Sequence, residues 1–133
     1  MQKSNTDVFM SIKPAEVNAI LRGSKTHVCR SYPLPATVRR IWLYTTAPIQ
    51  LIEYIICISH EEVEANTDGK PSSYGYQVLQ LWMLKHPIPL EEAISSGILS
   101  AAPRRYCWVA ESFLQSRPYY RQYPLGGQKG IVR

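Results

Sequence analysis

Short apolar runs, each bounded by proline, glycine or polar residues, follow one another along most of the chain. Residues 8–12, 41–44, 77–84 and 106–109 are rich in β-branched and aromatic side chains, which predicts a strand in each run. The longest run, 49–59, is rich in isoleucine and indicates a strand that is buried on both faces. We therefore expect a mainly β domain.

Two short helices are predicted between these strands. Val17, Ile20 and Leu21 form one apolar stripe at i, i+3 and i+4, Pro14 suits the first helical turn, and Gly23 suits the position after the last turn. A second helix is expected over 90–96, ended by a glycine. Because most connections are short or marked by proline, this order favours an α+β fold built on a small curled sheet or barrel rather than a doubly wound sheet.

The length of 133 residues predicts one domain, which we place at residues 8–115. Residues 1–7 are polar and expected to be flexible. Residues 60–73 are acidic and then rich in turn formers, which predicts a surface loop. Residues 116–133 have no acid and carry several tyrosines and cations, so we expect a basic, poorly packed tail.

Composition narrows the classes of partner. Lys and Arg outnumber Asp and Glu by 15 to 10, a formal charge of +5 that suits a polyanion but also occurs in many soluble domains. Three cysteines without close spacing support neither a metal site nor a disulfide framework, so we expect no metal and no cofactor. No run approaches the ~18 apolar residues of a membrane span. The expectation is an intracellular protein, cytoplasmic or nuclear, in a reducing compartment.

The segment from Gly23 to Arg30, where the first helix leads into an extended stretch, is the candidate binding site. Lys25 and Arg30, with the hydroxyl of Thr26 between them, are able to hold an anion or a polar base. From composition alone, ordinary solvated residues that flank a strand explain them better. In an extended stretch Val28 would point inward together with Arg30, and Cys29 to the other face, where a catalytic thiol is a weaker alternative.

Four stretches in this order resemble the ASCH domain of the PUA-like superfamily. They are Ser11-Ile12-Lys13-Pro14, Gly23-Ser24-Lys25-Thr26 with Arg30, Ile41 to Pro48, and Pro87 to Leu90 leading to Ala102-Pro103-Arg104-Arg105-Tyr106. The resemblance implies a small PUA-like β-barrel with two or three short helices and a cleft for RNA or a nucleotide-like ligand. The residues that the resemblance and the local composition place at this cleft are Lys13, Lys25, Thr26, Arg30, Tyr44, Thr45, Thr46, Arg104 and Arg105.

Two alternatives to binding stay open. One branch of the family hydrolyses the acyl amide of N4-acetylcytidine with a lysine and a threonine three positions later; Lys25 matches the lysine, but Val28 stands at the second position and has no hydroxyl. An enzyme of this kind, or a ribonuclease, would rely on Lys25. Alternatively the cleft is vestigial, and the basic tail or the 60–73 loop contacts a protein.

Overall fold

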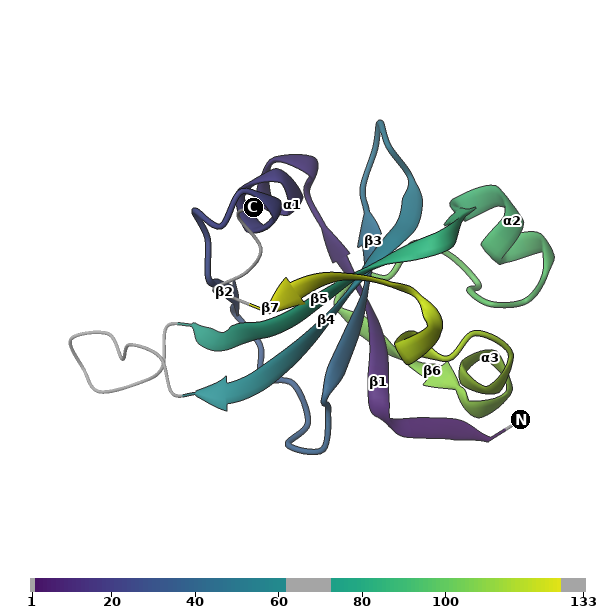
Figure 1. Ribbon diagram of the computed structural model, residues 1–133. Helices are drawn as coiled ribbons and strands as arrows, with labels where there is room; N and C mark the ends of the chain where they lie inside the picture. The colour runs from purple at the N-terminus through teal and green to yellow at the C-terminus, as the bar shows by residue number, and fades with distance from the viewer. Residues whose placement is uncertain (1, 62–72, 128–133) are drawn as a thin grey trace.

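One twisted sheet carries the fold, and the computed structural model describes it for residues 2–61 and 73–127 (Figure 1). Its strands are β1 (Lys3–Ile12), β2 (His27–Arg30), β3 (Arg40–Thr45), β4 (Leu51–Glu61), β5 (Tyr74–Pro89), β6 (Tyr106–Ala110) and β7 (Tyr123–Gly127). The helices are α1 (Pro14–Leu21), α2 (Leu90–Ser95) and α3 (Glu111–Ser116), with a 3₁₀ turn, η1, at Tyr119–Arg121. The predicted mostly β, α+β fold is confirmed.

The strands are hydrogen-bonded in the order β2-β5-β4-β3-β1-β6, and β7 also pairs with β5. β1 and β3 run parallel, as expected for strands joined through a helix, and the other pairs are antiparallel. The sheet curls instead of staying flat (Figure 1). Its two ends in this order, β2 and β6, thereby come within reach of each other.

Alternating side chains bury both faces of the sheet. Val8 and Met10 of β1 belong to a core that α1 covers through Val17 and Ile20. Phe9, between them in sequence, belongs to a second core that also contains Ala93 of α2 and Phe113 of α3. Because successive side chains of a strand point to opposite faces, a strand between two cores must be apolar at nearly every position. This is the reason for the continuous apolar runs.

The local signals for helix ends are confirmed. α1 begins at Pro14 and ends at Leu21, and Gly23 takes a φ of 79° two residues later. Gly97 takes a φ of 82° after α2. In both places the glycine adopts the left-handed conformation that other residues reach at a cost.

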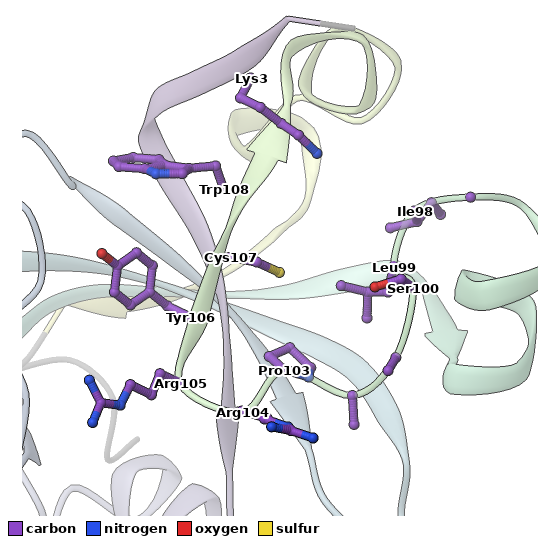
Figure 2. A pocket seen from close by; sticks show the side chains of 13 residues that line it. Lys3, Ile98, Leu99, Ser100, Pro103, Arg104, Arg105, Tyr106, Cys107 and Trp108 are labelled. Carbon is purple, nitrogen blue, oxygen red and sulfur yellow. The ribbon is translucent and has the colours of Figure 1, made fainter.

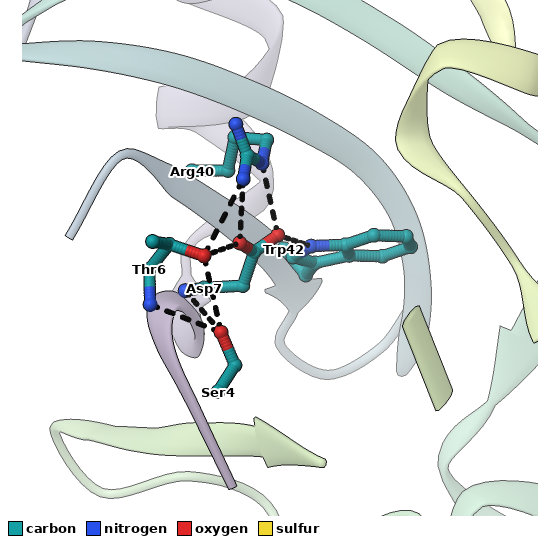
Figure 3. A network of polar contacts seen from close by, with 5 residues as sticks. All are labelled: Ser4, Thr6, Asp7, Arg40 and Trp42. Carbon is teal, nitrogen blue, oxygen red and sulfur yellow. Dashed lines mark hydrogen bonds and ion pairs between the residues drawn. The ribbon is translucent and has the colours of Figure 1, made fainter. Parts of the chain in front are cut away.

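The first residues differ from the expectation of a flexible N-terminus, because β1 already begins at Lys3. Asp7 is fully buried and accepts hydrogen bonds from Trp42 Nε1 at 2.8 Å and from Arg40 Nη2 at 3.0 Å (Figure 3). Ser4 is also buried and accepts the backbone N–H groups of Thr6 and Asp7. A satisfied polar network replaces apolar burial here, which is why no hydrophobic run marks this half of the strand.

The C-terminal segment also differs from the expected tail. α3 was not predicted, and β7 pairs with residues 80–83 of β5. The prolines at 87 and 89 do not end β5 as expected, since its pairing with β4 continues to Pro89. Of the predicted 60–73 loop, residues 62–72 lie outside the described residues, as do residues 128–133 of the predicted tail.

Candidate functional site

The two ends of the strand order meet at Tyr32 and Arg105. Tyr32 follows β2, Arg105 precedes β6, and the Tyr32 hydroxyl donates a hydrogen bond to the Arg105 carbonyl oxygen at 3.2 Å. We call this meeting place the seam. The seam brings the Gly23–Arg30 candidate segment close to the Arg104–Arg105 pair. The segment and the pair are some 75–80 residues apart in sequence.

Beside the seam, one carboxylate holds the two predicted cations. Glu16, in the first turn of α1, lies 3.2 Å from Arg30 Nη1 and 3.8 Å from Lys25 Nζ. All three side chains are partly shielded from solvent, with 16% to 37% of each exposed. We call these three residues the Glu16 cluster. It carries a net charge of +1, so an incoming anion meets a cationic cluster.

Arg30 ties three elements together. Its guanidinium also donates to the backbone oxygens of Cys29 at 2.8 Å and Ser11 at 3.1 Å. The Ser11 hydroxyl in turn donates to the Pro103 carbonyl oxygen at 2.6 Å. The forked donor set of arginine therefore fixes β2 against the end of β1, which is bonded in turn to the segment that carries Arg104 and Arg105.

Aromatic rings and a cation stack along the seam. The Arg105 guanidinium lies 5.1 Å from the centroid of the Tyr32 ring, and the Tyr32 ring stacks on Tyr106 with centroids 6.3 Å apart. Trp108 meets Tyr106 edge to face at 6.2 Å. Burial raises the pKa of Tyr32, and the nearby charges of Arg30 and Arg105 oppose that rise. Tyr32 is therefore a neutral hydrogen-bond donor at physiological pH.

A pocket of about 930 Å³ runs along β6. It is lined by Lys3, residues 97–103, Arg104, Arg105, Tyr106, Cys107 and Trp108 (Figure 2). Figure 2 shows Arg105, Tyr106 and Trp108 on one side of β6, whereas Cys107 points to the loop that carries Leu99 and Ser100. We call this hollow the β6 pocket. Three cations and no carboxylate line it, so its charged groups favour an anion.

The remaining residues predicted for the site lie apart from this pocket. Lys13 is exposed at the start of α1, where its carbonyl oxygen accepts the N–H groups of Glu16 and Val17. Thr26 is exposed and hydrogen-bonded to His27 Nδ1 at 2.8 Å. Both residues are at the surface, Lys13 just before α1 in sequence and Thr26 shortly after it.

Tyr44 and Thr45 lie in the interior. Tyr44 is 2% exposed and belongs to the core shared with α2 and α3, and Thr45 is 3% exposed. The backbone N–H of Thr46 donates to the Ile12 carbonyl oxygen, which closes the end of β3 against β1. The three positions stabilise this end of the sheet. The side chains of Tyr44 and Thr45 are buried and cannot contact a ligand at the surface.

Four residues of the site were not singled out in the sequence. Glu16 is one polar residue of the predicted first helix, and Tyr32 stands in a proline-rich segment. Lys3 falls in the expected flexible terminus, and Trp108 in a closing strand. Only the curl of the sheet places them together, and none of them has a local signal for this.

Solved structures of the ASCH protein from Zymomonas mobilis have the same arrangement of elements. The wild-type protein aligns with a TM-score of 0.64 over 84% of this chain and 93% of that chain, at 18% sequence identity. The chain has the ASCH fold. A serine-to-alanine variant of the same protein aligns with a TM-score of 0.65 over 86% of this chain and 95% of that chain. The ASCH resemblance read from the motifs is thus confirmed at the level of the fold.

Two further comparisons gave no match. No family model matches the sequence, and no curated protein matches it significantly. Within residues 2–61 and 73–127, no three His, Cys, Asp or Glu side chains gather where they could hold a metal ion. None of the helices described is long and apolar enough to cross a membrane.

Proposed function

We propose that this chain binds RNA, or a nucleotide-like ligand, at the seam. The observation that carries the proposal is the lining of the β6 pocket, which includes the cations Lys3, Arg104 and Arg105 and no carboxylate. A guanidinium offers two parallel donors that match the oxygens of a phosphate, as they also match those of a carboxylate.

The aromatic rings favour a nucleotide over inorganic phosphate. Tyr106 and Trp108 are only half-buried, and they lie on the same side of β6 as Arg105 (Figure 2). Bases stack on tyrosine and tryptophan rings, and each such contact contributes about 1–3 kcal/mol to the binding of single strands. Lys3 and Arg104 lie on the other side of β6, so Arg105 is the cation of this pocket that stands beside the two rings (Figure 2). A base stacked on these rings would have its phosphate next to the Arg105 guanidinium.

The Glu16 cluster extends the same surface. Arg30 is held in place by its bonds to Glu16 and Ser11, whereas Lys25 makes only a 3.8 Å contact with Glu16 and keeps 37% of its side chain exposed. In this proposal Lys25 contacts a phosphate or a base oxygen, and Arg30 makes a forked contact with the same ligand. The motif resemblance supports this use of the segment, because it implies a cleft at the same lysine and arginine.

Fluorescence anisotropy with labelled single-stranded RNA tests the proposal. We expect an Arg104→Gln/Arg105→Gln variant to bind about tenfold more weakly than the wild type at low salt, and with a shallower salt dependence. The matched control is Arg22→Gln/Arg39→Gln, which removes the same charge from two exposed arginines that do not line the β6 pocket. Equal affinities for the two variants would contradict the proposal.

An amidohydrolase would need a different use of the same residues. Val28, at the position of the family's hydroxyl, is fully buried and has no nucleophile to offer. Hydrolysis would therefore rely on Glu16 as the general base beside Lys25. A Glu16→Gln variant separates the two functions. For binding, removal of a carboxylate from the cation cluster should raise RNA affinity severalfold, because Lys25 and Arg30 lose a competing anion.

For hydrolysis, the same Glu16→Gln variant should abolish turnover, because the amide cannot serve as a general base. Release of acetate from acetylated cytidine by the wild type, lost in this variant, would make the chain an enzyme. If this chain captures a protein partner, and the capture persists after nuclease treatment and with the Lys25→Ala variant, the chain is an interaction module instead.

A further inference from the structure

A second cationic hollow lies between the end of β5 and the segment that follows α3. It has a volume of about 420 Å³, and its charged lining consists of Lys85, Arg117 and Arg121 beside His86. No carboxylate lines it. We call it the C-terminal hollow. It contains none of the residues of the Glu16 cluster or the β6 pocket, so it is a separate concentration of positive charge.

Hydrogen bonds of one glutamine hold this segment against the sheet. The Gln122 side-chain oxygen accepts the Lys85 backbone N–H at 3.0 Å, and its amide nitrogen donates to the Pro118 carbonyl oxygen at 3.1 Å. The N–H groups of Arg121 and Gln122 close the 3₁₀ turn on Pro118 and Tyr119. The hollow is therefore organised before a ligand arrives, which lowers the entropic cost of binding.

An aromatic pair continues from the core to the surface beside the hollow. Tyr119 packs edge to face on Trp82 at 5.0 Å and receives the Arg40 guanidinium at 4.2 Å from its ring centroid. The neighbouring Tyr120 contacts Tyr119 at 5.4 Å, lines the hollow, and is 68% exposed. An exposed ring that is held by an anchored ring offers a base a ready stacking surface.

A third, smaller hollow connects this site with the β6 pocket. It has a volume of about 260 Å³, shares Lys3, Gly97 and Ile98 with the β6 pocket, and shares Ser116 and Arg117 with the C-terminal hollow. Its charged lining is Lys3, Arg117 and the carboxylate of Glu92, so a strand that follows it passes one acidic group. The three depressions therefore follow one another over the surface. A chain-like ligand long enough to span all three would contact both cationic hollows.

We propose that the C-terminal hollow is a second contact surface for a single RNA strand that also crosses the β6 pocket. The choice of RNA rests on the proposed function. The cations of this hollow would also attract an acidic protein segment. The exposed Tyr120 ring beside them favours RNA, because a base can stack on the ring and a glutamate side chain cannot. The strand's phosphates contact Lys85 and Arg121, and a base stacks on Tyr120.

The test uses the full chain and a labelled single-stranded RNA of about 20 nucleotides, longer than the ~4–16 nucleotides of a single binding fold. We expect Lys85→Gln/Arg121→Gln to weaken binding about tenfold and to reduce the slope of log K against log salt by about 1.4, or about 0.7 for each lost phosphate contact. Tyr120→Ala should weaken binding about fivefold, whereas Tyr120→Phe, which keeps the ring, should bind as the wild type does.

The control variants distinguish this inference from the proposed function. Arg22→Gln/Arg39→Gln removes the same charge outside all three hollows and should leave the affinity nearly unchanged. Loss of binding with Arg104→Gln/Arg105→Gln but not with Lys85→Gln/Arg121→Gln would overturn the second surface and leave the function standing. The reverse pattern would contradict the seam as the RNA site, and it would also overturn the inference of one strand that crosses both surfaces.

Two other outcomes would overturn the inference. One is a wild-type chain that binds no single-stranded RNA of any length at low salt, which would contradict the proposed function as well. The other is a Lys85→Gln/Arg121→Gln variant that keeps its RNA affinity but no longer binds polyglutamate. That result would assign the hollow to an acidic protein segment.

Discussion

The buried carboxylate of Asp7 shows how one residue sets the position of a strand. Its side chain is fully buried, and its two oxygens accept bonds from Arg40, Trp42 and Thr6 (Figure 3). An isolated carboxylate would be costly in this environment, so the network has to form as a whole. Polar residues thus occupy part of the interior without breaking the sheet.

We predict that Asp7→Asn lowers the free energy of unfolding by about 3 kcal/mol, because it leaves the Arg40 charge without its partner. Lys25→Ala, which breaks a 3.8 Å ion pair at the surface, should cost less than about 1 kcal/mol. Urea unfolding of both variants measures the difference. Equal losses in the two variants would show that the Asp7 network adds nothing to an ordinary surface pair.

At the scale of the elements, the sequence predicted those whose signals are local. The apolar stripe of Val17, Ile20 and Leu21, closed by a proline and a glycine, is enough to place α1. The apolar runs were correct for the central strands, since burial on both faces leaves a continuous apolar pattern. Elements held by distant polar contacts were missed.

The first half of β1 and the segment from α3 to β7 are such elements. Residues 3–7 pair and bond through Ser4 and Asp7, and neither residue type predicts a strand. The C-terminal segment docks through Gln122 and Tyr119, whose partners lie on β5 and β3. The candidate site was found in part for the same reason: Lys25 and Arg30 share a motif, but Glu16 and Tyr32 join them only through the fold.

The ring of Tyr119 anchors the segment from α3 to β7 against the sheet. Tyr119→Ala should lower the free energy of unfolding by about 3 kcal/mol, because its ring fills the space between Arg40 and Trp82. Tyr120→Ala, one residue further on, should cost well under 1 kcal/mol, since most of that ring is exposed. Thermal unfolding with near-ultraviolet circular dichroism would separate them, and similar melting temperatures for both would contradict the docking.

At the scale of the molecule, the sheet is covered on its two faces, and its ends are closed by side chains at the seam instead of by backbone pairing. A barrel closed by a strand ladder would leave no room between its ends. Here Tyr32 and Arg105 close the gap with one hydrogen bond and a stacked cation. The same closure that completes the fold therefore gathers the cations and rings proposed to bind RNA.

Burial of tyrosine hydroxyls and cysteine thiols makes the free energy of unfolding sensitive to alkaline pH. Burial raises the pKa of Tyr32, Tyr54 and Tyr76, as well as that of the Cys57 and Cys107 thiols. In the unfolded chain a tyrosine loses its proton near pH 10, and a cysteine near pH 8.5. Above these values the folded chain holds more protons than the unfolded chain, so the free energy of unfolding falls as pH rises. Below about pH 7 these groups are protonated in both states and contribute no slope.

Tyr54→Phe isolates one of these groups. Burial is the main cause of its raised pKa, and the charge of Glu53 adds to it. We expect the variant to match the wild type in urea unfolding at pH 7.5 and to lose less stability between about pH 9.5 and 11, because one ionising hydroxyl is gone. Tyr76→Phe should behave differently: it removes the acceptor of the Leu34 N–H at 2.7 Å and so lowers stability at neutral pH as well. A wild-type stability that stays level up to pH 11 would contradict the shared assignment of these shifts to burial.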